Sequence, residues 1–484
     1  MDPHAQGAAN LRIGRPQVLV VGAGPAGLVA GIALARQDID VLVVDRRPEA
    51  STLSRALVIS TRTMELLRSW GVEEQVRAGA ADVEPRAWVT RTLASGGGTE
   101  MPLGYPSAAE AALVSPTRPA WAPQDHLEPI LLALLRSSPT AAVRFGLELI
   151  GLEQDERNAH AVLRERESGR IQRIDVQYVV GADGARSTVR SHLGIPMDGP
   201  DNLGEYQRVE FHAALGDVVG KRRYGLYVIT HPDAGGVLAP RGNSGRWGFS
   251  REWHPGERSL SDYEPDQLIS LIGTAVGVPE PRPDIERTSS FSIAAQLADR
   301  YREGRCFLVG DAAHRMTPRG GTGLNTAVQD AYALGWKLGW VLRGWARPEL
   351  LDSYETERRP IGEHNVGRTG APDGAKRAST EALPWDLNGR LTHHWINQAD
   401  PPISTLDLLG PGLTLFTGPG WAGAVNGVDV RPPVTRHSLD AAATSALQLE
   451  PAGAVLVGPD AQPLARWAGP TEPLHADALP AIAG

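Results

Sequence analysis

The sequence has a single cysteine, Cys306, among its 484 residues. One cysteine excludes an internal disulfide framework and any paired-cysteine redox or zinc site. His393 and His394 are adjacent and do not converge as ligands four residues apart on a helix would. No HExxH pattern occurs either, so no metal site is expected. A reducing cytoplasm suits such a chain.

The sequence also lacks a long uninterrupted hydrophobic run. Residues 1–16 are polar and contain no signal-peptide core, and the apolar run that follows is interrupted by four glycines and Pro25. Neither a secretory leader nor a membrane span is predicted. The net charge of −8 is spread along the chain without a basic run or an acidic tail. This argues against nucleic acid and anionic membranes, and leaves a small molecule as the expected partner.

Residues 18–45 form a stretch suited to holding a dinucleotide. A strand-type run, VLVV, is followed by Gly22, Gly24 and Gly27 in GxGxxG spacing, then by an Ala/Leu-rich helix and a second strand that ends at Asp45. The glycines permit a sharp turn, close approach of a pyrophosphate and tight helix–strand packing, while the helix N-terminus favours phosphate charge. Asp45 can accept hydrogen bonds from ribose hydroxyls. FAD and NAD share this unit, so it does not choose between them.

Two later segments again run from an apolar strand into glycine and aspartate. In YVVGADGARSTVR, Asp183 and Gly184 lie near Arg186 and could contact nucleotide sugars and phosphates, although a plain polar turn explains the segment equally well. Residues 304–341 place Asp311 at the carboxyl end of a strand, where α/β sheets bind ligands. A glycine-rich loop then leads into a long helix. Its first N–H groups favour a negative charge, such as that of a reduced flavin.

The length of 484 residues predicts two or three domains. Residues 194–286 alternate apolar and polar positions between many Gly, Pro and Asp breaks, which indicates an antiparallel sheet with one covered face. A Gly/Ala/Pro-rich linker follows residue 365, and short strands return from residue 404.

Taken together, GAGPAG with Asp45, GADGARSTVR and GDAAHRMTPRGGTGLN resemble the motifs of the group A flavoprotein monooxygenases, over residues 16–365. These are aromatic hydroxylases with the p-hydroxybenzoate hydroxylase fold, and the third motif and the C-terminal stretch resemble their polyketide and phenol hydroxylase branch. The implied fold is α/β: a Rossmann-like FAD-binding domain, an inserted antiparallel-sheet substrate domain and a small C-terminal thioredoxin-like domain without redox cysteines. The expected boundaries are 1–85, 110–195 and 287–375 for the FAD-binding domain, 86–109 and 196–286 for the substrate domain, and 376–484 for the C-terminal domain.

The resemblance also implies a cofactor site. The residues expected to contact FAD are Gly22, Gly24, Gly27, Asp45, Arg46, Arg55, Gln124, Asp183, Asp311, Pro318, Gly321, Gly323, Leu324 and Asn325. Asp183 and Gly184 would also serve the reductant, and the backbone of Leu324 and Asn325 would face the N1/O2 edge of the flavin. From its spacing alone, Arg55 is almost as well explained as an exposed surface arginine.

Two positions depart from the family's pattern. Asp45 stands where the family often has Glu, a change that should be tolerated. Arg319 stands where the family frequently has an apolar or aromatic residue. Pro318 and Arg319 are expected to line the flavin and substrate side, so this arginine could alter the pocket or the movement of the flavin. The sequence identifies no catalytic base.

The implied reaction is hydroxylation of an aromatic, polycyclic phenolic substrate of the polyketide type found in antibiotic biosynthesis. The enzyme would bind FAD non-covalently, consume NADPH or NADH and O2, and transfer oxygen from a flavin C4a-hydroperoxide. Baeyer–Villiger oxygenation of a polyketide ketone on the same scaffold stays open, as do a non-catalytic flavin-binding protein and an NAD dehydrogenase that uses only residues 18–45. The expected assembly is a cytoplasmic monomer or homodimer, without nucleic acid, membrane or metal.

Overall fold

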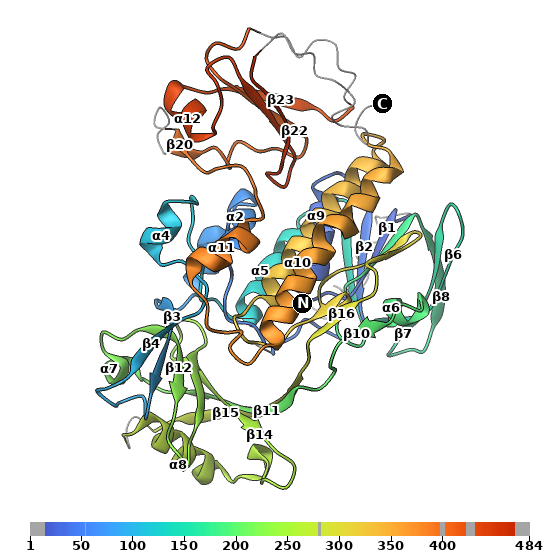
Figure 1. The fold of residues 1–484 in the computed structure, drawn as a ribbon. Helices are drawn as coiled ribbons and strands as arrows, with labels where there is room; N and C mark the ends of the chain where they lie inside the picture. The colour runs from blue at the N-terminus through green and yellow to red at the C-terminus, as the bar shows by residue number, and fades with distance from the viewer. Residues whose placement is uncertain (1–14, 54, 279–281, 397–401, 423–430, 470–484) are drawn as a thin grey trace, which may run out of the picture.

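The computed structural model describes residues 15–53, 55–278, 282–396, 402–422 and 431–469. In Figure 1 the long helices α9 (Gly323–Leu342) and α10 (Asp352–Gly370) cross the middle of the molecule, with a group of antiparallel strands below them and the C-terminal elements above.

A six-stranded sheet, here called the central sheet, forms the core beneath these helices. Its strands, in spatial order, are β17 (Arg302–Glu303), β18 (Cys306–Leu308), β9 (Tyr178–Gly181), β1 (Val18–Val21), β2 (Val41–Asp45) and β5 (Ala141–Phe145). All neighbours pair in parallel except β17, which is antiparallel to β18. Every residue of β1, β2 and β9 is buried, as expected for apolar strands covered on both faces. The predicted strand–turn–helix–strand unit is therefore confirmed, with α1 (Pro25–Ala35) as its helix.

Helix α1 packs tightly against α9. Its residues from Ala26 to Ala35 are all buried, because the helix is apolar on every side and is covered by both the sheet and α9. A Cβ at Gly335 of α9 would lie 2.5 Å from the Cβ of Ala33, so the missing side chain lets the two helices approach.

A second sheet, here called the outer sheet, lies below the central helices in Figure 1. Its strands, in spatial order, are β15 (Asp284–Ile293), β11 (Gly204–His212), β14 (Arg246–Trp253), β13 (Gly236–Pro240), β12 (Tyr224–Ile229), β3 (Glu84–Thr90) and β4 (Thr99–Pro102). Only β12 and β3 pair in parallel. One face packs on α8 (Pro265–Val276), through Val209, Phe211 and Phe249 among others. The predicted antiparallel sheet with one covered face is confirmed.

Alternation along β11 separates the two faces of the outer sheet. Val209 and Phe211 point into the core with α8, so Tyr206, Arg208 and Glu210 lie on the opposite face. Strand β15 pairs with β11 as far as Ile293, beyond the expected boundary at residue 286. A register shift between Glu210 and Phe211 lies opposite that boundary and does not end the pairing. The division into domains stays a prediction.

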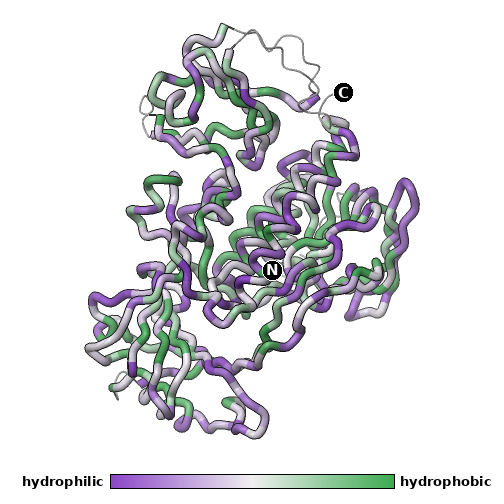
Figure 2. Tube along the Cα trace, in the orientation of Figure 1, coloured by the Kyte–Doolittle hydropathy of each residue, from purple (hydrophilic) through white to green (hydrophobic). Residues whose placement is uncertain are grey.

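Other helices and strands precede α9 along the chain. They are α2 (Thr61–Ser69), α3 (Glu73–Ala78), α4 (Ala108–Ala112), α5 (Gln124–Arg136), α6 (Thr188–His192), α7 (Gly216–Val219), the antiparallel strands β6 (Leu147–Gln154), β7 (Ala159–Glu165) and β8 (Ile171–Val176), and β10 (Met197–Asp198), β16 (Gln296–Ala298) and β19 (His314–Arg315). No helix in the described part of the chain is long and apolar enough to cross a membrane. Figure 2 shows hydrophobic and hydrophilic segments interspersed along the central helices.

The C-terminal elements follow α11 (Ser379–Leu387) and the short pair β20 (Trp395–Ile396) and β21 (Ile403–Ser404). They form a four-stranded sheet in the order β23 (Val434–Ser438), β22 (Leu413–Thr417), β24 (Ala454–Val457) and β25 (Pro463–Trp467), with α12 (Ala441–Ala446). Trp336 and Trp340 of α9 are buried in one cluster with this sheet, in keeping with their interpretation as packing residues. The thioredoxin-like assignment stays a prediction.

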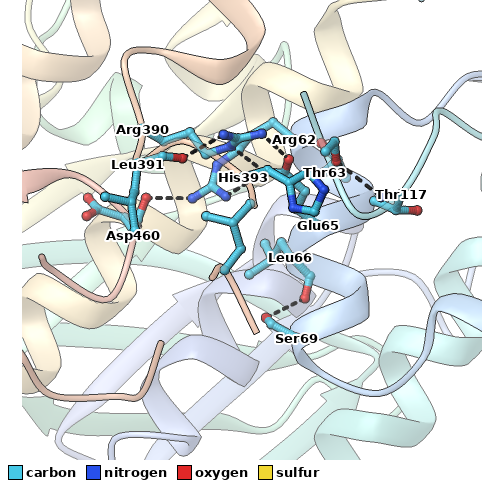
Figure 3. Close-up of polar contacts among 12 residues, drawn as sticks. Arg62, Thr63, Glu65, Leu66, Ser69, Thr117, Arg390, Leu391, His393 and Asp460 are labelled. Carbon is cyan, nitrogen blue, oxygen red and sulfur yellow. Dashed lines mark hydrogen bonds and ion pairs between the residues drawn. The ribbon is translucent and has the colours of Figure 1, made fainter. Parts of the chain in front are cut away.

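A buried charge cluster also joins the C-terminal part to α2. In Figure 3, Arg62 and Arg390 converge on Glu65. Arg62 Nη1 donates to Glu65 Oε2 at 2.9 Å and Arg390 Nη2 donates to Glu65 Oε1 at 2.5 Å. Arg62 Nη2 also donates to the carbonyl oxygen of Asp460 at 2.6 Å. The side chains of Glu65 and Arg390 are only 2% and 3% exposed, so this contact lies inside the interface.

Candidate functional site

The turn after β1 is built around glycines. Gly22 has a φ of +107°, and a Cβ there would lie 2.3 Å from the carbonyl oxygen of Ala182. A Cβ at Gly27 would lie 1.8 Å from the carbonyl oxygen of Gly22, whereas a Cβ at Gly24 would meet no atom of the described residues within 4 Å. Gly24 is the N-cap of α1 and makes no side-chain cap bond. The open space beside Gly24 and the free N–H groups of the first helical turn therefore form a cradle that suits a pyrophosphate.

Asp45 ends the neighbouring strand and is held beside this turn by Arg47. Its Oδ2 accepts the N–H of Ala23 at 2.8 Å, and its Oδ1 accepts the N–H and Nε of Arg47 at 2.8 Å and 3.0 Å. Burial alone would raise the pKa of Asp45, but the hydrogen bonds from Arg47 and Ala23 lower it below its usual value. The group is therefore a carboxylate that can accept ribose hydroxyls. Sequence reasoning named Arg46, whose side chain is exposed; the arginine at the carboxylate is Arg47.

Glu128, which the sequence analysis did not name, lies beside two of the expected residues, Gln124 and Arg55. Gln124 begins α5, donates its backbone N–H to the carbonyl oxygen of Ala56 at 3.0 Å, and donates Nε2 to Glu128 Oε1 at 2.6 Å. Burial raises the pKa of Glu128, and the Gln124 hydrogen bond and the positive charges of Arg47 and Arg55 oppose that rise. Arg55 itself is exposed. The buried Oε2 of Glu128 has no protein partner among the described residues, so it suits a hydroxyl donor from a ligand. Its one sequence signal was the four-residue spacing from Gln124 on one helix face.

Asp183 follows β9 and caps α6. Its Oδ2 accepts the N–H groups of Thr188 at 2.6 Å and Val189 at 3.0 Å. Its Oδ1 is buried without a partner in the described part of the chain, and burial raises the pKa of this carboxyl. Gly184 has a φ of +81° with open space around it, and the Arg186 side chain is exposed. One oxygen of Asp183 thus serves the fold and the other stays available to a ligand.

Asp311 follows β18 in a short 3-10 turn, and its side chain is exposed. The preceding Gly310 has a φ of +61°, and a Cβ there would lie 2.9 Å from Ala327 of α9 and 3.2 Å from Ala26 of α1. Gly310 therefore brings this corner directly against the first turn of α1.

The sheet order brings these motifs together. Strands β18, β9, β1 and β2 are consecutive and parallel, so their carboxyl ends lie along one edge of the central sheet. That edge carries, in order, Asp311, Asp183, Gly22 and Asp45. Three motifs far apart in the sequence thus form one elongated site, which is the shape an extended dinucleotide requires.

The loop before α9 closes one end of this edge, and its residues 318–325 are here called the flavin loop. Gly320 and Gly321 have φ values of +80° and +61°, and Thr322 caps α9 without a side-chain bond. Asn325 is 3% exposed, and its side chain accepts the N–H of Ser60 at 2.8 Å and donates to Val58 and Gly321 oxygens, each at 3.1 Å. The Asn325 side chain therefore holds the loop, while the backbone N–H groups that begin α9 are left for a negative charge.

The flavin loop faces the outer sheet through Arg319. The Nη1 of Arg319 donates to the carbonyl oxygen of Ala371 at 3.2 Å. Burial raises the pKa of Tyr206 on β11, and Arg319 is close enough to oppose that rise. Tyr206 stacks on Phe291 of β15 with ring centroids 5.6 Å apart, and the Arg208 guanidinium lies 4.9 Å above the Phe291 ring. An aromatic and cationic surface thus lies opposite Arg319, while the Pro318 side chain is exposed.

A cavity of about 40 Å³ lies on the other side of the flavin loop, bordered by Tyr105, Thr322, Asn325 and Arg368. This space suits a few water molecules.

Known proteins with the same features place the chain in a family. A family model described as "FAD binding domain" matches residues 15–369. The chain is 35% identical to aklavinone 12-hydroxylase of Streptomyces purpurascens, with 96% of this chain and 97% of that protein covered. It is 32% identical to tetracenomycin B2 monooxygenase-dioxygenase of Streptomyces olivaceus, with 92% and 93% covered.

Solved structures agree with these relatives. A structure of aklavinone-11 hydroxylase with FAD and aklavinone is similar with a TM-score of 0.84 and 31% identity, over 97% of this chain and 99% of that one. The flavin-dependent monooxygenase PieE, solved with FAD and substrate, gives a TM-score of 0.85 at 27% identity, over 94% and 96%.

The family predicted from the sequence motifs is confirmed, as is FAD as cofactor with NADPH or NADH as co-substrate. The alternatives of an NAD dehydrogenase and of a flavin carrier without turnover are not supported, because the relatives are named hydroxylases and monooxygenases along nearly the whole chain. The chain therefore belongs to the FAD-binding-domain family and is a flavoprotein monooxygenase of its polyketide hydroxylase branch.

Proposed function

We propose that this enzyme hydroxylates a polycyclic, phenolic, polyketide-type substrate with NADPH or NADH and O2. The observation that carries the proposal is the pairing of the elongated sheet-edge site with an aromatic, cationic face of the outer sheet, joined at Arg319. The likeness to aklavinone and tetracenomycin enzymes along nearly the whole chain supports the same class of substrate.

The residues of the sheet edge suit FAD. The adenosine end would lie against Asp45 and Glu128, the pyrophosphate beside Gly24, and the ribityl chain near Asp311. The oxygens of Glu128 and Asp183 that lack a partner among the described residues would accept its hydroxyl groups. Bound FAD supplies hydride acceptance from the reductant and activation of O2 for transfer to a ring carbon.

The chain's own groups then control charge and water. The N–H groups at the start of α9 would stabilise negative charge on the pyrimidine edge of the flavin. The stacked rings of Tyr206 and Phe291 offer a flat apolar surface to a polycyclic substrate. Arg319 and Arg208 place positive charge where a phenolic oxygen would lie, which favours the more electron-rich phenolate form of the ring. The outer sheet also excludes water from the reacting centre.

We further propose that the enzyme works in the cytoplasm as a monomer or homodimer, with no nucleic-acid or membrane partner. The absence of a basic run supports the first exclusion.

The test is NADPH consumption by the FAD-loaded enzyme against a panel of aromatic polyketides under ¹⁸O2, with product, peroxide and label all quantified. The expected product gains one labelled hydroxyl oxygen on a ring. A labelled ester or lactone would indicate Baeyer–Villiger oxygenation instead. The proposed hydroxylation would be contradicted if no phenolic ligand accelerated flavin reduction by NADPH and no oxygenated product formed.

Two single variants, Tyr206→Ala and Arg319→Ala, test where the substrate binds. Both variants should raise KM for the active polyketide by about tenfold, because each removes one wall contact, while FAD content stays unchanged. Tyr263→Ala is the matched control, since Tyr263 packs with the α8 side of the outer sheet and should leave KM unchanged.

A further inference from the structure

Three successive carbonyl groups of the flavin loop, those of Gly320, Gly321 and Thr322, accept hydrogen bonds from residues of the protein. The Tyr105 hydroxyl lies 2.9 Å from the carbonyl oxygen of Gly320 and 3.0 Å from that of Gly321, and donates to them. The Asn325 amide donates to the same Gly321 oxygen at 3.1 Å. The backbone N–H and hydroxyl of Thr326 both donate to the carbonyl oxygen of Thr322 at 2.9 Å.

The direction of these carbonyl groups sets the direction of the next N–H groups. In a trans peptide unit the C=O and the N–H of the following residue point in opposite directions. Holding the Gly321 carbonyl toward Tyr105 therefore turns the N–H of Thr322 to the opposite side of the loop. The Thr322 carbonyl does the same for the N–H of Gly323, which begins α9. These N–H groups precede the first intrahelical donor, the N–H of Thr326, so they are free to bind a ligand. They lie just before Leu324 and Asn325, the residues whose backbone was expected at the flavin.

We propose that Tyr105 is a positioning residue of this enzyme, whose hydroxyl orients the flavin loop so that the N–H groups of Thr322 and Gly323 face the pyrimidine edge of FAD. The inference rests on the proposed function and adds a residue to its cofactor machinery. Tyr105 acts through the loop backbone.

The surroundings of Tyr105 suit this role. Its ring packs in a cluster with Val58, Leu103 and Trp121, and meets the Trp121 ring edge-on with centroids 6.4 Å apart. Burial raises the pKa of Tyr105, so the hydroxyl keeps its proton and stays a donor at physiological pH. The ring therefore fixes the position and the hydroxyl supplies the hydrogen bond.

Tyr105 also connects the two sheets. It lies three residues after β4, the last strand of the outer sheet, and the intervening Leu103 forms a bridge with Arg377. The outer sheet, which offers the aromatic face to the substrate, thereby reaches the backbone that holds the cofactor. A shift of this sheet on substrate binding would move the flavin loop through the hydrogen bonds of the Tyr105 hydroxyl.

The test is the Tyr105→Phe variant, which keeps the ring and removes the hydroxyl. We expect FAD to bind about fivefold more weakly in fluorescence titration, the effect of one lost hydrogen bond. The midpoint potential of bound FAD should shift to more negative values, because the reduced anion loses donors. Tyr224→Phe is the matched control, since the Tyr224 hydroxyl bonds Glu100 at 2.6 Å, away from the loop.

An unchanged dissociation constant and midpoint potential would overturn the proposal, as would equal shifts in Tyr105→Phe and Tyr224→Phe. A lower Tm of the apoprotein without either cofactor effect would show that Tyr105 supports only the fold. Failure of the proposed function has a different signature, because the wild-type enzyme would then make no oxygenated product whatever the variant does to FAD binding.

Discussion

At the scale of single residues, the carboxylates along the sheet edge have different tasks. Asp45 is held in place by Arg47 and Ala23, and Asp183 gives one oxygen to α6 and keeps the other. Asp311 is exposed at the end of β18. The same residue type after a parallel strand can therefore build a turn, cap a helix or await a ligand, and only the local hydrogen bonds decide which.

The three glycines of the first turn make a sharp prediction, because they differ in what an added methyl would meet. In Gly27→Ala the Cβ would collide with the backbone of Gly22, so the apoprotein itself should lose about 3 kcal/mol or more of stability. In Gly24→Ala the methyl meets no atom of the described residues, so the Tm of the apoprotein should hold. The methyl would fill the pyrophosphate space, and FAD affinity should fall by about tenfold or more.

Titration of the apoprotein with FAD and thermal denaturation of both variants check this pair. If Gly24→Ala binds FAD like the wild type, the pyrophosphate does not lie beside Gly24. If Gly24→Ala instead unfolds as readily as Gly27→Ala, the turn has no room for a methyl group at residue 24.

At the scale of elements, most strands of the central sheet could be predicted from the sequence. Apolar runs ending in glycine and aspartate predicted β1, β2, β9 and β18 correctly, because strands buried on both faces need little beyond hydrophobicity and a turn. The outer sheet was predicted as an antiparallel sheet, and the resemblance assigned residues 86–109, which include most of β3 and all of β4, to the same domain. Its strand order was not predicted. Long-range pairing leaves no local trace.

The site was less predictable than the strands that support it. Tyr105 reaches it by a hydrogen bond to Gly320, a residue remote in the sequence. Arg47 and Glu128 bond near neighbours, Asp45 and Gln124, and come to the site because the central sheet and α5 bring those neighbours there. Glu128 reads as an ordinary helix residue, and Tyr105 lies in a loop without a motif. Their roles depend on which elements become neighbours, and this is a property of packing rather than of spacing.

The docking of the C-terminal part on α2 gives a prediction about Glu65. In Glu65→Gln the buried Arg390 loses its carboxylate partner, so the free energy of unfolding should fall by about 3 kcal/mol. Arg390→Met added to Glu65→Gln should recover part of this loss, because one of the two arginine charges that Glu65 balances is then gone. Glu148→Gln is the control, since its partner Arg164 has a side chain that is 47% exposed, and a change of about 0.5 kcal/mol is expected.

Urea unfolding of the three variants measures these values. A loss in Glu65→Gln no larger than in Glu148→Gln would mean that the cluster in Figure 3 contributes nothing to docking.

His393 makes the same interface sensitive to pH. Burial, with the positive charge of Arg390, lowers the pKa of His393 to about 4 from 6.5, and its Nδ1 pairs with the Ser404 hydroxyl at 2.8 Å. The folded state therefore holds a neutral imidazole, while the unfolded chain binds a proton below pH 6.5. Stability should rise with pH between about 4 and 6.5, by about 3 kcal/mol in total for this group. In His393→Gln this part of the slope should vanish.

The measurement is Tm against pH for the wild type and His393→Gln, with His160→Gln as the exposed control. Parallel curves for His393→Gln and the wild type between pH 4 and 6.5 would show that His393 is not the titrating group.

At the scale of the whole molecule, the two sheets are joined by charge as well as by the loop. Glu210 on β11 is buried and accepts from Arg246 at 2.6 Å and from Arg287 at 2.7 Å. Arg246 also pairs with Asp125 at the start of α5, and Arg287 donates to the carbonyl oxygen of Thr52 at 3.0 Å. The substrate-facing side of the outer sheet is thereby tied to the segments that hold the cofactor edge.

Arg246→Met tests whether this tie matters for the chemistry. The variant keeps the aliphatic stem, and Arg287 still neutralises Glu210, so the fold should survive. The outer sheet would lose its ion pair to α5 and fit less closely over the flavin loop, which admits water and misplaces the substrate. Product formed per NADPH consumed should fall by about threefold to tenfold, with peroxide making up the difference. FAD content and the rate of NADPH consumption should change little, because the cofactor contacts lie on the central sheet.

Arg164→Met, at a surface arginine paired with Glu148, is the control. A product-to-NADPH ratio in Arg246→Met equal to that of Arg164→Met would mean that the outer sheet needs no charged tie to exclude water.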